Sequence, residues 1–153
     1  MYSKEEAAQI KQEFWTSYGK YMSPVLSSEG LKQNWINYNT GIKHLFFRTL
    51  AERKRIYVGI QILHKDASMR SLIFEQFTQL KNILEEFTNE KWIWEENVTD
   101  DFGNAYSHIY IENTNYTLFR KEDWPEIISF FKPRIIALDE FWNTVKYSFD
   151  IFK

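Results

Sequence analysis

The sequence predicts one α+β domain spanning residues 1–153, with a five-stranded, mainly antiparallel sheet and helices packed on it. Apolar residues recur at a helical spacing in some segments and alternate at a strand spacing in others. The elements follow the order helix, three strands, helix, two strands and two final helical segments. This order contains two hairpin-like pairings and no repeated strand–helix–strand unit, which favours an antiparallel sheet over a doubly wound one.

The chain begins with a helix and continues with strands. Ser3 and Glu6 have the spacing of a capping box, and Pro24 ends the helix that follows. Trp35–Tyr38 is predicted as the first strand because an Asn-Thr-Gly turn signal follows it. Leu45–Leu50 is predicted as the second strand.

The middle of the chain holds the clearest strand and a second helix. Ile56–Ile62 alternates β-branched residues with other types, as a strand with a core-facing side does. Asp66 is predicted to cap a single helix that runs to Thr88–Asn89. Trp92–Val98 and Ala105–Ile111 then form a strand pair around a loop rich in turn-forming residues.

The last part of the chain is predicted to be helical. Asp123 is expected to cap it, and Pro125 suits its first turn. Pro133 would remove a backbone N–H from a helix interior, so we expect two separate helical segments. Apolar residues from Ile135 to Phe149 recur at a helical spacing and predict a buried face.

Composition excludes several classes of chemistry. The chain has no cysteine, which removes thiolate catalysis, disulfides and cysteine-ligated zinc. No apolar run is long enough to cross a bilayer, and the N-terminus is unlike a signal peptide. We expect a soluble, cytoplasmic protein without a membrane partner. Because no phosphate-binding loop and no catalytic motif occurs, we expect no cofactor and no catalytic residues.

Charge is distributed unevenly along the chain. Residues 43–70 contain seven basic and two acidic residues, a net of +5, whereas residues 85–126 have a net of −8. The basic stretch covers the second and third predicted strands, and such cations bind phosphates while exposed rings stack on bases. The residues predicted to contact DNA or RNA are Lys43, Arg48, Arg53, Lys54, Arg55 and Tyr57. The alternative is a solvated turn whose cations protect the sheet edge from aggregation.

Two histidines form a further candidate site. If the second and third strands form a hairpin centred on Lys54, His44 lies opposite His64, and Asp66 would be a third ligand for a metal. The His-x-His and His-x-x-x-His spacings of common metal sites are missing. Histidines without a metal are therefore the simpler interpretation.

An aromatic surface is predicted on the fifth strand. Tyr106, His108 and Tyr110 share one face by alternation, and Tyr57 and Gln61 are expected beside them. Such a surface would suit a small molecule or a peptide. We expect the Trp-rich last helix to cover this face instead.

Aromatic residues occur at distinctive points along these elements, in the segments Phe14-Trp15, Trp35, Arg55–Ile60, Phe74–Leu84 and Trp92–Glu95. Their placement resembles an uncharacterised bacterial family, domain of unknown function 4268. The resemblance covers nearly the whole chain and implies no chemistry. Members of that family often follow a nuclease-like N-terminal part, which implies an accessory role near DNA metabolism or defence.

The leading functional hypothesis is a non-enzymatic recognition module that binds nucleic acid through the basic hairpin. A protein-interaction or homodimerisation module that uses aromatic surface and the acidic half is the alternative. An enzyme with an unrecognised site near His44, His64 and Asp66 is the third and weakest hypothesis.

Overall fold

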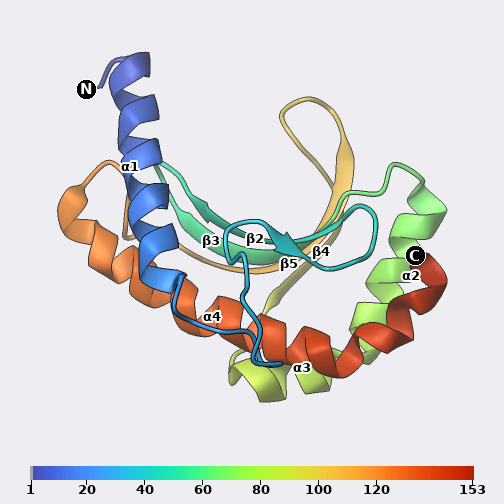
Figure 1. The fold of residues 1–153 in the computed structure, drawn as a ribbon. Helices are drawn as coiled ribbons and strands as arrows, with labels where there is room; N and C mark the ends of the chain where they lie inside the picture. The colour runs from blue at the N-terminus through green and yellow to red at the C-terminus, as the bar shows by residue number, and fades with distance from the viewer. Residues whose placement is uncertain (1) are drawn as a thin grey trace.

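The computed structural model describes residues 2–153 and shows helices packed on one antiparallel sheet (Figure 1), which confirms the predicted α+β class. The strands are β1 (Tyr38–Asn39), β2 (Leu45–Ala51), β3 (Ile56–Ile62), β4 (Ile93–Thr99) and β5 (Ala105–Asn113). The helices are α1 (Lys4–Met22), α2 (Ala67–Gln79), α3 (Lys81–Thr88) and α4 (Trp124–Val145), with the 3-10 segments η1 (Lys121–Asp123) and η2 (Lys146–Phe152).

The prediction of a five-stranded sheet is wrong: four strands of seven to nine residues make up the sheet, and only the two-residue segment β1 lies beside them. Of the segment Trp35–Tyr38, only Tyr38 lies in a strand, the two-residue β1 at the edge beside β2. Trp35 turns into the interior instead, where its indole Nε1–H donates to the carbonyl of Val25 at 2.9 Å. The Asn34 side chain accepts the backbone N–H of Asn37 at 3.0 Å, which makes this segment a turn.

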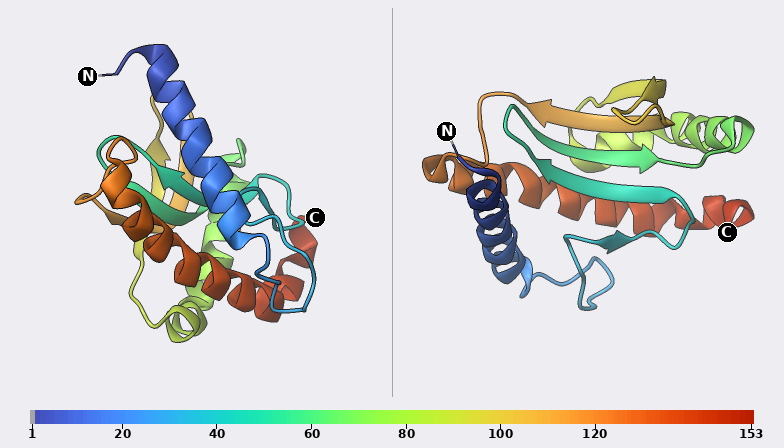
Figure 2. Two further views of the ribbon diagram at one scale, coloured as in Figure 1. Left: turned by 60° about the vertical axis from the view of Figure 1, so that its left-hand side comes forward. Right: turned by 90° about the horizontal axis from the view of Figure 1, so that it is seen from above.

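The sheet has the strand order β1-β2-β3-β5-β4, and every neighbouring pair is antiparallel. On one face, buried residues such as Ile60 and its partner Ile109 point toward α4. Phe47 of β2 packs on Trp142 of α4 on this side, with ring centroids 5.4 Å apart. Figures 1 and 2 show α4 crossing beneath the sheet and the opposite face free of helices.

The helix predicted to follow Asp66 is divided into two. Asp66 caps α2 as predicted, since its carboxylate accepts the backbone N–H of Ser68 at 2.8 Å. At Leu80 the backbone leaves the helical region, with φ −100° and ψ 9°, and α3 starts in a new direction. The turn lets the apolar face of α3, with the fully buried Leu84, pack against α4. The burial of the apolar face of α3 thus outweighs the helical sequence pattern that continues across Leu80.

The final helix differs from its prediction in two ways. Pro133 lies inside α4 without dividing it, because the buried face that includes Phe130 packs along both sides of the proline. Arg134 donates to the carbonyl of Phe130 at 2.9 Å in the turn that contains the proline. Asp123 precedes α4 but makes no side-chain cap, since its carboxylate accepts the backbone N–H of Thr117 at 3.0 Å.

In the part of the chain described here, none of the helices has the length and apolarity that a membrane crossing requires. The longest, α4, buries one side against the sheet and against α3. The Phe14 and Tyr18 side chains of α1 pack on Phe131 near the start of α4, with ring centroids 6.2 and 5.4 Å from it. The helices therefore form a layer on one side of the sheet.

Candidate functional site

The strand order separates most of the basic residues of the 43–70 stretch from the acidic residues of β4 and the loop after it. Five of the seven cations between residues 43 and 70 lie on β2 or in the turns at its ends, toward the β1 edge of the sheet. The other two, Lys65 and Arg70, lie after β3 and on α2. Glu95, Glu96, Asp100 and Asp101 lie on β4 and the loop after it, at the opposite edge. For the cations on and around β2, the charge asymmetry along the sequence therefore becomes a charge difference across the sheet.

Few of these cations are neutralised. Of the seven basic residues between 43 and 70, Arg55 alone has a carboxylate oxygen within 4.0 Å among residues 2–153. The others are Lys43, Arg48, Arg53, Lys54, Lys65 and Arg70. The positive potential of the stretch is thus largely uncompensated at short range.

Arg55 is engaged in ion pairs within the protein and is not a free surface cation. Its guanidinium pairs with Glu52 at 2.8 Å and with Glu112 of β5 at 2.9 Å. Burial opposes its charge, but the hydrogen bonds to these two carboxylates outweigh burial and raise the Arg55 pKa. A cation held by two acids has little capacity left for a phosphate.

Arg48 and Arg53 are arranged differently, because each lies over an aromatic ring. The guanidinium carbon of Arg48 is 4.4 Å from the centroid of Phe46, and that of Arg53 is 4.8 Å from Phe119. A ring orders a guanidinium without neutralising it, so its N–H groups stay available at the surface. Lys54 is exposed beside Arg53 in the turn. We refer to Arg48, Arg53 and Lys54 as the basic edge.

Lys43 is separated from the turn. It precedes β2, whereas Arg53 follows it, so the seven-residue strand lies between them. At about 3.3 Å per residue, the two backbone positions are roughly 20 Å or more apart. The predicted nucleic-acid residues therefore do not form one cluster.

Tyr57 is fully buried, so its ring has no free face on which a base could stack. The ring lies over Gly59, two residues along β3, and stacks on Tyr110 with centroids 5.2 Å apart. Its hydroxyl is 2.8 Å from Nδ1 of His108 and accepts from Gln61 at 3.3 Å. Tyr57 is thus part of the sheet's own packing.

The helix-free face of the sheet carries the polar network in which Tyr57 takes part. The predicted residues Tyr57, Gln61, His108 and Tyr110 do share this face, but α4 covers the opposite one, contrary to expectation. Glu95 Oε1 lies 2.8 Å from His108 Nε2 and completes a chain of hydrogen bonds through His108 to Tyr57.

Burial shifts the pKa values of this network. It lowers the pKa of His108 more than the hydrogen bond from His108 to the Glu95 carboxylate raises it. Burial also raises the pKa of Tyr57, and that of Tyr110 to about 12, so both hydroxyls stay protonated at neutral pH. Because the Tyr57 hydroxyl is buried and hydrogen-bonded to His108 and Gln61, the network stabilises the sheet.

The histidine pair is in contact, although with a shifted register. The turn centres between Arg53 and Lys54, so His44 is opposite Leu63, yet the His44 and His64 rings approach to 4.9 Å between centroids. The carboxylate of Asp66 caps α2. Residues 2–153 contain no group of three or more His, Asp or Glu side chains arranged to hold a metal ion.

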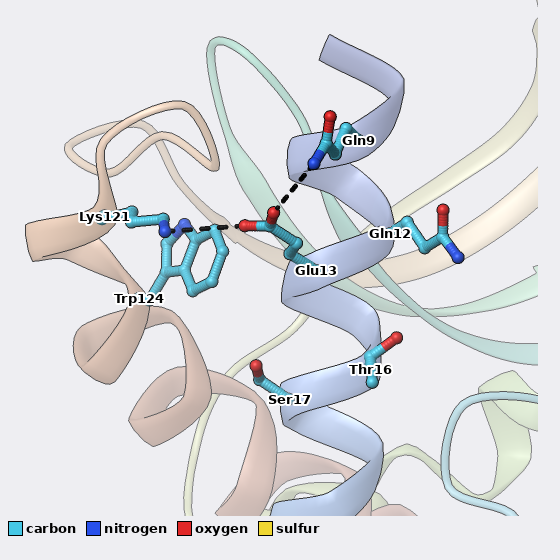
Figure 3. Close-up of a pocket in the computed structure, with 7 residues that line it drawn as sticks. All are labelled: Gln9, Gln12, Glu13, Thr16, Ser17, Lys121 and Trp124. Carbon is cyan, nitrogen blue, oxygen red and sulfur yellow. Dashed lines mark hydrogen bonds and ion pairs between the residues drawn. The ribbon is translucent and has the colours of Figure 1, made fainter. Parts of the chain in front are cut away.

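A shallow groove runs between α1 and the start of α4 (Figure 3). Glu13 accepts from Gln9 at 3.4 Å and pairs with Lys121 at 3.5 Å. Trp124 forms one wall, while Gln12 and Thr16 point away from it along α1. The charged groups in this groove, Glu13 and Lys121, already pair with one another, so it offers no unpaired charge to a ligand.

Sequence reasoning did not identify Phe119 or Arg70 as important. Phe119 supports Arg53 from 66 residues away along the chain, and no local pattern could reveal this contact. Arg70 was counted as a basic residue, but it is only 4% exposed. The sequence does contain a sign of this burial, because Arg70 follows Met69 directly on the apolar stripe of its helix, where a cation is unusual.

Comparison with known proteins gives a family and no activity. The family model described as Domain of unknown function (DUF4268) matches residues 10–146. The chain matches no curated protein and no solved structure. The family assignment agrees with the resemblance in the aromatic pattern.

Proposed function

Because the chain belongs to the Domain of unknown function (DUF4268) family, whose description carries no activity, we propose a function from geometry: a non-enzymatic recognition module that binds nucleic acid at its basic edge. One observation carries the proposal. Arg48 and Arg53 are stacked on aromatic rings and have no carboxylate partner among residues 2–153.

The chemistry of the basic edge fits phosphate binding better than it fits the alternative interpretation, a solvated turn without a ligand. An ordered guanidinium loses less side-chain entropy when it binds, and its planar N–H groups match phosphate oxygens. Phe46 and Phe119 hold the two guanidinium groups at opposite parts of β2 and its turn. Two guanidinium groups held at separate positions suit separate phosphates of one nucleic-acid strand more than a single small anion.

The test is fluorescence-anisotropy binding to short single- and double-stranded DNA and RNA over a salt series. The diagnostic variant is Arg53→Glu with Lys54→Glu. Its matched control is Lys32→Glu with Lys91→Glu, which makes the same change in net charge at exposed positions outside β2 and its turn. We expect wild-type binding to weaken with salt, with a slope of about −0.7 to −0.9 per phosphate neutralised.

The hairpin variant should lose at least about tenfold in affinity and reduce the salt slope by roughly 1.4–1.8, as expected for two lost phosphate contacts. The control variant should show only a small, non-specific loss. Equal losses in both variants would mean that net charge alone matters, and no binding at low salt would refute the proposal.

A second candidate is a protein interface at the acidic edge. Phe102 is 89% exposed in the β4–β5 loop beside Asp100 and Asp101, and Ile93 of β4 is 45% exposed. Exposed apolar side chains beside charged residues are typical of interaction surfaces. A second copy of this chain, with its basic edge, has complementary charge. Light scattering over a wide concentration range tests this: association that Phe102→Ser abolishes supports it, and a constant monomer mass refutes it.

A further inference from the structure

A second cationic site lies at the other end of the sheet from the β2–β3 turn. A pocket of about 450 Å³ opens between the connection from β3 to α2 and the β4–β5 loop. Its lining includes Leu63 and Lys65 on one side, Asn104 and Tyr106 on the other, and Arg70 of α2. This volume lies within the range of pockets that hold small molecules.

Arg70 is the unusual member of this lining. It is 4% exposed, and no carboxylate oxygen among residues 2–153 lies within 4.0 Å of its guanidinium. Buried charges in proteins are normally paired, because an unpaired ion in the interior loses its hydration without electrostatic compensation. The contacts of Arg70 within the protein are all to neutral groups.

Those contacts leave one hydrogen-bond donor unused. Asn97 Oδ1 accepts from Nε at 3.1 Å and from Nη2 at 3.0 Å. The carbonyls of His64 and Lys65 accept from Nη1 at 2.8 and 3.4 Å. A guanidinium has five N–H groups, and four are accounted for. The remaining hydrogen, on Nη2, has no partner within the described chain.

The neutral partner of Arg70, Asn97, has an energetically unfavourable backbone conformation. It lies in the bulge of β4, between Glu95 and Val98, with a left-handed φ of 58°. Ser107 fixes it by accepting its backbone N–H at 3.0 Å. Such bulges redirect side chains and occur often beside binding sites. An aspartate at position 97 would neutralise Arg70, so the amide leaves the charge available.

We propose that this pocket binds an oxyanion, the phosphate or carboxylate group of a small ligand, through the guanidinium of Arg70. Lys65 adds a second positive charge at the exposed end of the pocket. Asp100 is the one acid among the lining residues, and its Oδ1 faces its own turn, where it accepts the N–H of Phe102 and of Asn104. An anion that reaches Arg70 provides the missing counter-charge.

The decisive variant is Asn97→Asp, because it supplies a carboxylate inside the protein without changing the shape of the side chain. The control is Asn115→Asp, which adds the same charge at an exposed position just after the far end of β5. Thermal unfolding is measured in sodium phosphate, in sodium succinate and in sodium chloride at equal ionic strength. NMR titration of the wild type follows the Arg70 Nε–H and the amides of residues 103–106, so one readout needs no variant.

We expect one of the two anions to raise the Tm of wild type and of Asn115→Asp saturably above the value in chloride. At ten times the Kd the rise should be roughly 3–6 °C. Asn97→Asp should have a higher Tm in chloride and bind the anion at least about tenfold more weakly.

The two anions distinguish the sources of the oxyanion. A response to phosphate alone assigns a phosphate ester, and a response to succinate alone assigns a carboxylate ligand. The same unfolding temperature in all three salts, with no saturable shift of the Arg70 resonance, would refute the proposal. A response that Asn97→Asp retains in full would refute the assignment to Arg70.

Discussion

Gly59 is the position at which one methyl group should disturb the helix-free face most. Its φ is not in the left-handed region, so the backbone accepts alanine without strain. A Cβ built on Gly59 would, however, lie 2.5 Å from Cζ and 2.6 Å from Cε1 of Tyr57. Real contacts of this kind are never so short, so Gly59→Ala must displace the buried ring.

The magnitude follows from opposing terms. Replacing glycine by alanine at a compatible φ stabilises a protein by about 0.4–1 kcal/mol, because it lowers the conformational entropy of the unfolded chain. Overpacking a filled site costs about 1–3 kcal/mol. Displacing Tyr57 also removes the hydroxyl from His108 Nδ1, and a buried group left without its partner costs about 1–3 kcal/mol. The net expectation for Gly59→Ala is a loss of about 2–4 kcal/mol in the free energy of unfolding.

Urea denaturation followed by circular dichroism measures this loss, and Gly19→Ala is the matched control. Gly19 lies in α1, where a Cβ would meet only the flexible end of Ile36 at 3.3 Å. Alanine is favoured over glycine in helices by about 1 kcal/mol, so Gly19→Ala should be neutral or stabilising. In a Tyr57→Ala background, Gly59→Ala should cost far less. Wild-type stability of Gly59→Ala would refute the described packing of Tyr57.

Two further changes test buried polar groups. Asp139 is 1% exposed, and its side chain accepts hydrogen bonds from the Tyr38 hydroxyl at 2.5 Å and from the Ser28 backbone N–H at 2.8 Å. Asp139→Ala should therefore lower the free energy of unfolding, measured by urea denaturation, by about 3 kcal/mol. A loss below about 1 kcal/mol would contradict this account. Burial lowers the pKa of His108 below its usual 6.5, so the unfolded chain takes up the proton first. Stability should therefore be complete above about pH 6.5 and decline as pH falls through the folded pKa, and His108→Gln should remove this part of the pH profile. An unchanged profile would refute the role of His108.

Local features of the fold are predictable from the sequence. The capping box needs only Ser3 and Glu6, and both of its hydrogen bonds are present, at 3.1 and 3.2 Å. The β2–β3 hairpin follows from two alternating segments joined by a short turn, and its register differs from the predicted one by a single residue. In each case the determining residues are close together in the chain.

Features that depend on distant packing were missed. Alternation correctly placed Tyr57 and His108 on one face but could not tell which face α4 would cover. It also could not show that Tyr57 is buried beneath its neighbours, which removes it from the candidate nucleic-acid surface. Pro133 predicted a break because local propensity ignores the core that α4 fills on both sides of it. The side-chain partner of Arg70, Asn97, likewise lies in a bulge of β4, 27 residues further along the chain.

The strand order also has a consequence for the way the chain folds. Two hairpins, β2–β3 and β4–β5, each join neighbouring segments and can form early, because closing a short loop costs little entropy. The seam between them joins β3 to β5, where Ile60 lies opposite Ile109, 49 residues further along the chain. Closing it requires α2 and α3 to fold back first or at the same time. We therefore expect substitutions along this seam to slow folding more than substitutions in either turn, which makes the β3–β5 pairing the step that commits the chain to its native topology.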